Sequence, residues 1–304
     1  MCRVLAYLGS QIPLENLLYK PDSSLLKQAY RPQMLQMLNL AGFGMMAWDP
    51  ASYLPDIPFR YTTTELPVFD ANLHNLSAKL RPRCLLAHVR GVPYNERVHV
   101  SRQNLHPFNF EGTPLTLAHN GDLAQFDIYK FALAEYVRPE IRTQVRGSTD
   151  SEWIYALLLS QLDDPAARPS LDTLVRALDS ALAVLRRIRQ QEGVTRSSST
   201  NLFVTDGSLL IATRFTYDFG CYGDSVHEGN LRYLSQWFTV GRDYDFHDGE
   251  WKMIGGAANS DSILVASEPL TVDTSTWLEV PEYSALCANR VDGKLTLRTV
   301  ELAA

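Results

Sequence analysis

Short runs of apolar residues, each ended by glycine, proline or a polar residue, dominate the first part of the chain. They cover residues 4–8, 42–48, 84–89 and 115–119. Runs of this length with such boundaries are typical of buried β-strands. Residues 50–70 are rich in proline and show no apolar period, which predicts a surface loop, and a short helix is expected over 73–80.

The middle of the chain changes to a helical period. Residues 151–162 and 170–189 carry apolar side chains three and four positions apart, which predicts two helices separated by Asp164-Pro165. Ser148 or Asp150 is suited to cap the first helix, because short polar side chains accept hydrogen bonds from the free N–H groups of a helix start.

After a polar stretch at 196–200, short apolar runs predict strands again. They cover residues 202–205, 209–213, 251–254, 262–266 and 294–297. Asp206-Gly207 favours a hairpin between the first two, with a loop of two residues or slightly more. Strands, a central helix pair and further strands favour stacked layers of helices and sheets over alternating βαβ units. No linker or internal repeat interrupts the pattern, so one domain over residues 1–304 is expected.

Composition and charge exclude several classes of function. Hydrophobic residues make up 45% of the 304, and the net charge is -6 with no basic run, which argues against nucleic acid as a partner. No apolar run approaches the roughly 20 residues of a membrane-spanning helix, and no signal peptide is recognisable, so we expect a cytoplasmic protein without membrane association. The four cysteines are widely separated and lack zinc-site spacing, which predicts neither a disulfide framework nor a metal.

Cys2 is a candidate nucleophile. Its small side chain favours removal of Met1, and the chain would then begin with a thiol and a free α-amino group on one residue. A thiolate attacks carbonyl carbon readily, and an α-amino group with a pKa of about 7.7 to 8.0 can accept the thiol proton near neutral pH. The alternative is that Cys2 is only the first residue of a buried strand, and its position alone favours this alternative.

Two apolar runs end in residues with a possible catalytic role. Arg90 follows the run over 84–89 and is either a solvated end residue or a bidentate clamp for a substrate carboxylate. Asn120 and Gly121 follow the run over 115–119. An Asn-Gly pair most often makes a tight turn, but its amide and its glycine N–H can also form an oxyanion hole, since glycine permits close approach.

Two further segments have both a structural and a functional interpretation. Asp150 lies in Gly-Ser-Thr-Asp-Ser-Glu at a helix start, where it is either ordinary capping chemistry or a carboxylate that binds a substrate ammonium group. Gly42 and Gly44 weaken a strand unless a neighbouring backbone must approach it closely. His106, between the Arg90 and Asn120 segments, is expected to be structural.

In their order along the chain, these segments resemble the class II glutamine amidotransferases, which are N-terminal nucleophile hydrolases. The specific motifs are cysteine at position two, HVR at 88–90, HNG at 119–121 and GSTDSE at 147–152. The resemblance continues more loosely over 212–214 and 265–270. These later segments are similar to the branch that includes γ-glutamyl hydrolases of ergothioneine synthesis and the fungal glutathione-degrading amidotransferase subunit.

The resemblance implies an α+β fold, a four-layer αββα sandwich, in a mature chain of residues 2–304. It implies that Cys2 is the nucleophile, that its own α-amino group is the base, and that no cofactor or metal is required. The remaining roles carry over by position. Arg90 would hold the α-carboxylate of a γ-glutamyl group, and Asp150 would hold its α-ammonium group. Asn120 and Gly121 would form the oxyanion hole, Gly42 would lie near the new N-terminus, and His119 would complete the substrate site.

Two positions depart from the family pattern. An acidic residue often precedes the glycine pair, where this chain has Ala41. The WATHG-type run that follows the clamp arginine in large synthases reads Gly91-Val92-Pro93-Tyr94-Asn95 here. Closure of the glutamine loop, and with it the grip on the group attached to the γ-carbonyl, is therefore expected to differ.

Together these features predict hydrolysis of the γ-amide of glutamine or of a γ-glutamyl compound, through a γ-glutamyl thioester on Cys2. One alternative is a glutaminase subunit that passes ammonia to an acceptor or synthetase protein. A second alternative is a non-catalytic module that binds glutamine or glutamate and retains Met1.

Overall fold

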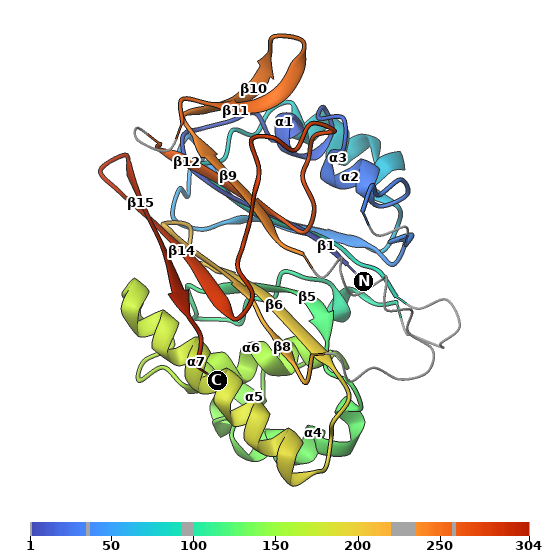
Figure 1. The fold of residues 1–304 in the computed structure, drawn as a ribbon, viewed down its shortest axis with the longest axis vertical. Helices are drawn as coiled ribbons and strands as arrows, with labels where there is room; N and C mark the ends of the chain where they lie inside the picture. The colour runs from blue at the N-terminus through green and yellow to red at the C-terminus, as the bar shows by residue number, and fades with distance from the viewer. Residues whose placement is uncertain (1, 35–36, 93–99, 220–234, 257–259, 304) are drawn as a thin grey trace.

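Two antiparallel β-sheets lie face to face at the centre of the molecule, with helices on both outer sides (Figure 1). The computed structural model describes residues 2–34, 37–92, 100–219, 235–256 and 260–303. Outside these ranges lie Met1, Cys221 and residues 93–95, which belong to the segment after Arg90 that departs from the family pattern. The layers follow the order helices, sheet, sheet, helices, which confirms the predicted α+β sandwich.

The first sheet contains the N-terminal strand. Its strands are β1 Arg3–Leu8, β2 Phe43–Trp48, β3 Phe59–Thr63, β4 Cys84–Val89, β9 Trp237–Gly241, β12 Ser262–Ala266 and β13 Leu278–Glu279. Across the described residues their order is β13-β9-β12-β1-β4-β2-β3. The central strands β1, β4 and β2 are buried at every position. Burial on both faces explains why these strands read as continuous apolar runs and not as an alternating pattern.

The second sheet is built from later parts of the chain. Its strands are β5 Thr116–Asp122, β6 Ser198–Thr205, β7 Leu209–Arg214, β8 Thr216–Tyr217, β14 Ser284–Val291 and β15 Lys294–Glu301. They follow the order β15-β14-β7-β6-β5, and β8 pairs with β6. Two further strands, β10 Asp243–His247 and β11 Glu250–Ile254, form a separate hairpin at the top of Figure 1.

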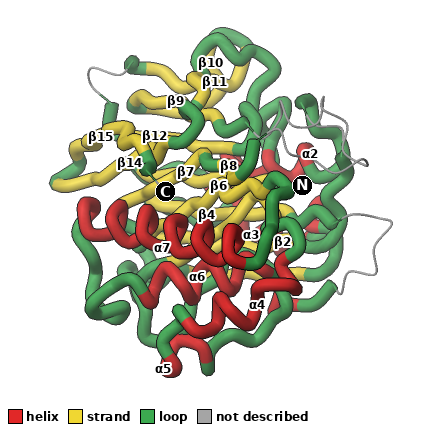
Figure 2. The backbone as a smooth tube through the Cα atoms, turned by 60° about the horizontal axis from the view of Figure 1, so that its bottom comes forward, coloured by secondary structure: helices red, strands yellow, loops and turns green. Residues whose placement is uncertain are grey.

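Helices cover the outer face of each sheet. Those beside the first sheet are α1 Leu14–Leu18, α2 Leu25–Gln28 and α3 Ala71–Ser77, and those beside the second are α4 Phe126–Glu135, α5 Pro139–Arg142, α6 Asp150–Ser160 and α7 Leu171–Gln191. Short 3₁₀ turns are η1 Pro67–Phe69 and η2 Arg102–Asn104. Figure 2 shows α4, α6 and α7 lying together against the strands. Within the described ranges, no helix combines the length and the apolar character needed to cross a membrane.

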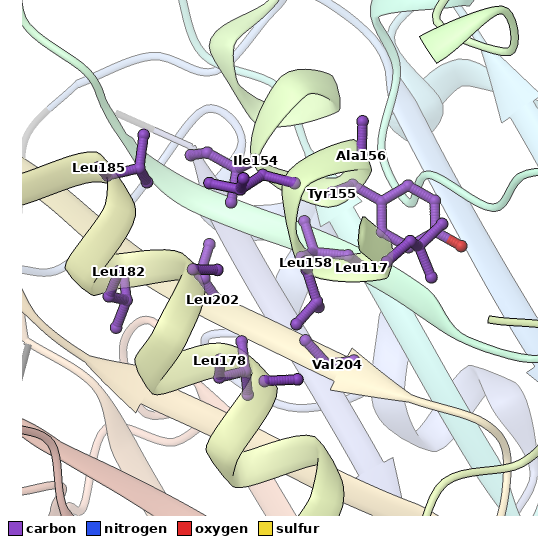
Figure 3. Close-up of a cluster of buried hydrophobic side chains, with 14 of the residues drawn as sticks. Leu117, Ile154, Tyr155, Ala156, Leu158, Leu178, Leu182, Leu185, Leu202 and Val204 are labelled. Carbon is purple, nitrogen blue, oxygen red and sulfur yellow. The ribbon is translucent and has the colours of Figure 1, made fainter. Parts of the chain in front are cut away.

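Three buried clusters separate the four layers. In the cluster beneath α7, Leu178, Leu182 and Leu185 lie on one helix face, because they are four and three positions apart (Figure 3). All three are fully buried, and burying a leucine side chain stabilises a fold by roughly 1.5–3 kcal/mol. Between the sheets, the even-numbered side chains of β1, such as Val4 and Ala6, face the second sheet.

Close packing explains the second glycine of the predicted strand over 42–48. A Cβ atom on Gly44 would lie 2.1 Å from the backbone oxygen of His106. The chain between η2 and β5 therefore crosses β2 at a distance that only glycine allows. This crossing brings the loop over residues 103–108 against the first sheet.

Several predicted boundaries are wrong. The expected loop over 50–70 contains β3, an edge strand whose side chains are exposed or half-buried and so show no apolar run. The polar stretch at 196–200 already belongs to β6, which begins at Ser198 and is buried throughout. Neither Ser148 nor Asp150 caps α6: Thr149 does, with its Oγ1 accepting a hydrogen bond from the Glu152 N–H. The Asp206-Gly207 hairpin is confirmed, with a loop over 206–208.

Candidate active site

The register of β1 and β4 brings Cys2 and Arg90 together. Arg3 pairs with Val89 and Val4 with His88, so one position further out Cys2 lies opposite Arg90. Opposite residues in an antiparallel pair point to the same face. Because Val4 faces the second sheet, Cys2 and Arg90 do so as well, at the edge of the space between the sheets.

The Cys2 side chain lies against the backbone that follows Arg90. Its Sγ accepts a hydrogen bond from the Gly91 N–H at 3.4 Å and is 3.6 Å from the Gly91 carbonyl oxygen. Only 9% of the Cys2 surface is exposed. Gly42, directly before β2, accepts a hydrogen bond from the Arg90 N–H, so it lies beside Arg90 with the β4 chain between it and Cys2.

Asn120 reaches the same space from the second sheet. Along β5, Ala118 faces the first sheet, and Asn120, two positions on, does the same. Its Nδ2 donates a hydrogen bond to Ser267 Oγ at 2.9 Å, and Ser267 Oγ also accepts from the Val4 N–H at 3.0 Å. Ser267 therefore connects Asn120 to the strand that carries Cys2. Among the described residues, the buried Oδ1 of Asn120 has no hydrogen-bond partner.

Gly121 is required by strand packing. A Cβ atom at this position would lie 2.0 Å from the backbone oxygen of Ser199 on β6. The Asn-Gly pair is therefore not a tight turn: both residues belong to β5 and pair with Asn201 and Thr200.

Asp150 is held in a fixed orientation at the start of α6. Its Oδ2 accepts a hydrogen bond from the Leu123 N–H at 2.7 Å, and its Oδ1 accepts from the N–H of Ser151 at 2.7 Å. Asp122 lies close to it. Asp122 is exposed at the end of β5, and desolvation of its carboxyl and the negative charge of Asp150 both raise its pKa. Two carboxylates that repel each other would both gain from a bound ammonium group.

Electrostatics links Arg90 to both Cys2 and Asp150. Burial lowers the pKa of the Arg90 guanidinium, while the proximity of Cys2 and the negative charge of Asp150 act in the opposite direction. The structure thus brings Cys2, Arg90, Asn120 and Asp150 around one space. The sequence analysis assigned no role to Ser267 or Asp122, although Ser267 lies in the loosely resembling segment 265–270 and directly follows the apolar run 262–266.

His119 lies behind this space. Its Nδ1 is 2.9 Å from Ser151 Oγ and its Nε2 is 2.9 Å from the backbone oxygen of Ser199. Ser151 Oγ is also within 3.0 Å of Asp150 Oδ1. His119 therefore contacts the residue that supports Asp150, and the structure does not bring it to the side of the sheet that Cys2 faces. In the ranges that the structure covers, no group of three or more His, Cys, Asp or Glu side chains is arranged to hold a metal ion.

Comparison with known proteins decides the family. The family model for class II glutamine amidotransferases matches residues 59–217, more than half of the chain. The chain belongs to the class II glutamine amidotransferases. This amidotransferase chain is 29% identical over 304 residues to the probable glutamine amidotransferase DUG3 of Saccharomyces cerevisiae, covering 94% of this chain and 81% of that one.

Two further relatives of this amidotransferase chain are hydrolases. The γ-glutamyl-hercynylcysteine sulfoxide hydrolase of Mycobacterium tuberculosis is 33% identical over 123 residues, which cover 40% of this chain and 49% of the relative. The protein of that name from Mycolicibacterium smegmatis is 26% identical over 216 residues, or 70% and 78% of the two chains.

Solved structures agree in fold with this amidotransferase chain. A glutamine aminotransferase class-II domain protein from Silicibacter pomeroyi superposes with a TM-score of 0.59 at 21% identity, covering 99% of this chain and all of the other. The glutamine phosphoribosylpyrophosphate amidotransferase of B. subtilis gives a TM-score of 0.56 at 16% identity, covering 99% of this chain and 49% of that one. At these identities the likeness establishes the fold.

Two buried histidines pack between the sheets beside Arg90. His88 and His106 stack with ring centroids 4.1 Å apart, so the expectation that His106 is structural agrees with its position. Burial, and to a lesser degree the charge of Arg90, lowers the pKa of His88 to about 3. Burial also holds the pKa of His106 well below its usual value.

Acid should destabilise this amidotransferase chain through His88. An unfolded histidine titrates near pH 6.5, so between that pH and about 3 the unfolded state binds one more proton at this site. The free energy of unfolding then falls as pH falls, by about 1.4 kcal/mol for each pH unit below 6.5. The change His88→Leu should remove this contribution. Urea unfolding at about pH 7, 6 and 5 gives the free energy of unfolding of both proteins at each pH. An equal decrease of this free energy with falling pH in the two proteins would contradict the assignment.

Proposed function

We propose that this class II amidotransferase hydrolyses the γ-amide of glutamine or of a γ-glutamyl compound through a γ-glutamyl thioester on Cys2. The observation that carries the proposal is the placement of three groups at one end of the space between the sheets. The thiol lies opposite the buried guanidinium in the register of β1 and β4, and the Asp150 carboxylate is held by the Leu123 N–H directly after the strand that carries Asn120. A γ-glutamyl group needs all three: a nucleophile for its carbonyl, a cation for its α-carboxylate and an anion for its α-ammonium.

In the first half of the reaction, the α-amino group of Cys2 accepts the thiol proton, through a water molecule, and Sγ attacks the γ-carbonyl carbon. Two N–H donors would stabilise the resulting oxyanion: the Asn120 Nδ2 and the Gly121 backbone N–H. Asn120 Nδ2 carries a second hydrogen besides the one that it donates to Ser267. Collapse of this intermediate breaks the C–N bond, and the protonated base returns the proton to the leaving nitrogen. Ammonia or an amine departs.

In the second half, a water molecule attacks the thioester carbonyl with the same amine as base. The C–S bond breaks, glutamate leaves, and the sulfur recovers its proton. Arg90 and Asp150 hold the same γ-glutamyl group throughout, so they position both steps. Asp122, beside Asp150, adds negative charge where the α-ammonium would lie.

The names of two relatives favour a hydrolase over a subunit that passes ammonia to a partner, since those proteins are hydrolases of a γ-glutamyl compound. Glutamate release from glutamine, glutathione and other γ-glutamyl amides, measured on the chain alone, tests this choice. Release from at least one of them without a partner protein is the expected result, and turnover only with an added acceptor protein would favour the subunit instead.

The change Cys2→Ala should abolish glutamate release, by on the order of 10³-fold or more, because it removes the atom that forms the thioester. Substrate binding, measured by calorimetry, should be largely retained, since Arg90 and Asp150 are untouched. Cys287→Ala is the matched control: this cysteine is free and buried in another cluster, so its loss should affect stability and leave turnover intact.

The same experiment needs the mass of the purified chain. Loss of Met1 is expected in the active wild-type protein. Full activity of Cys2→Ala, or activity in a preparation in which every molecule retains Met1, would place the nucleophile elsewhere. Complete retention of Met1 together with tight glutamate binding and no turnover would favour the non-catalytic module.

The change Arg90→Gln should raise KM by about 10- to 100-fold, because a hydrogen bond to a charged group contributes about 1.5–3 kcal/mol and the clamp acts on the bound substrate. Steady-state kinetics of glutamate release measure this. Arg60→Gln, at an exposed position on β3, is the control and should leave KM unchanged. An unaltered KM in Arg90→Gln would show that the α-carboxylate binds elsewhere.

A further inference from the structure

A buried ion pair lies on the opposite face of β1 from the Cys2 thiol. Arg3 points toward the helical side of the first sheet, and its Nε is 3.6 Å from Glu268 Oε2. Both side chains are almost completely buried, at 3% and 2% exposure. Arg3 Nη1 also donates a hydrogen bond to the backbone oxygen of Cys2 at 3.1 Å. The guanidinium therefore contacts the backbone of the proposed nucleophile.

Glu268 is itself fixed by the segment that follows α2. Its Oε1 accepts a hydrogen bond from the Gln33 N–H and its Oε2 from the Met34 N–H, each at 3.1 Å. Gln28, at the end of α2, donates to the backbone oxygens of Glu268 and Pro269 at 3.4 and 3.2 Å. The carboxylate thus connects Arg3 to the segment that follows α2 in the helical layer.

A buried ion pair is a weak source of stability, because two desolvated charges recover little more than the free energy that desolvation removes. Burial lowers the pKa of Arg3, and the charge of Glu268 opposes this shift. Stability alone is therefore a poor reason for this pair, which could be replaced by apolar side chains of similar volume.

The position of Cys2 in the chain suggests what the pair does. In the proposed mature form Cys2 is the first residue, and chain ends are poorly ordered unless they are tied down. The contacts that remain to fix its backbone are those of its carbonyl group and its side chain. A hydrogen bond from Arg3 to this carbonyl restrains rotation about the Cα–C bond of Cys2, and so sets the direction of both the amine and the thiol.

We propose that Arg3 and Glu268 are positioning residues: they hold the backbone of Cys2 so that its α-amino group and Sγ are aligned with the substrate carbonyl held by Arg90 and Asn120. This inference rests on the proposed function, since alignment matters only if Cys2 attacks a bound carbonyl. The pair acts through Cys2 and does not touch the substrate. It should therefore affect kcat and leave KM nearly unchanged.

The test uses the double variant Arg3→Met/Glu268→Gln, which removes both charges and leaves neither one buried alone. Its urea midpoint should stay close to that of the wild type, and its KM should change by less than about threefold. Its kcat should fall by about 10- to 100-fold, because a misplacement of the reacting atoms by about 1 Å has an effect of this size. The single variants, which leave an unpaired buried charge, should be less stable than the double variant.

The matched control is Arg168→Met/Asp206→Asn. These residues also form an ion pair with a buried carboxylate, at 3.2 Å. Asp206 lies in the hairpin between β6 and β7, at the end of β6 away from Ser199 and Asp122, and Arg168 lies between α6 and α7. This control should leave kcat unchanged. A wild-type kcat in Arg3→Met/Glu268→Gln, or an equal fall of kcat in both double variants, would overturn the positioning role.

A second readout does not depend on turnover. Alkylation of Cys2 by iodoacetamide, followed by peptide mass mapping, reports how well the thiol is held in its buried position. The rate should rise in Arg3→Met/Glu268→Gln and stay at the wild-type value in the control. Faster alkylation in the double variant, with no turnover even in the wild type, would retain the positioning role and reject the proposed function. Normal turnover in the wild type, with alkylation and kcat both unchanged in the double variant, would retain the proposed function and reject the positioning role.

Discussion

The antiparallel register between β1 and β4 is the constraint on which the candidate site depends. It pairs Arg3 with Val89, and so places Cys2 opposite Arg90 with both side chains toward the second sheet. A slip of one residue would turn the thiol toward the helical layer and leave the guanidinium without its partner group. A slip would also exchange the side chains of β1 and β4 between the two clusters on either face of the sheet, so close packing of the present residues favours this register.

The stacking of the two sheets supplies the rest of the site. Asn120 comes from the second sheet, and Ser267 connects it by hydrogen bonds to the strand that carries Cys2. Asp150 is oriented by the start of α6 and by the Leu123 N–H that follows β5. Four side chains from distant parts of the sequence thus owe their common location to packing between layers. This explains why a chain of the amidotransferase family needs the full sandwich to form so small a site.

The sequence predicts the central strands well and the edges poorly, and the reason is physical. Strands buried on both faces give unbroken apolar runs, whereas the edge strand Phe59–Thr63 and the polar start of β6 do not. The motif over 119–121 led us to predict both Asn120 and His119 as site residues, although neighbours in a strand point to opposite faces. Ser267 lies in the resembling segment 265–270, but its role could not be derived from sequence alone, because that role depends on a contact between two sheets that no local pattern records.

The central claim is that a γ-glutamyl group is transferred to the sulfur of Cys2. The most direct measurement is acid quenching during turnover of a γ-glutamyl amide, followed by intact mass and peptide mapping. The account predicts a mass increment of one γ-glutamyl group on the peptide that begins at Cys2, with Met1 absent, and loss of this increment at neutral pH as glutamate appears. Turnover at a full rate without any such adduct, or an adduct on another residue, would contradict it.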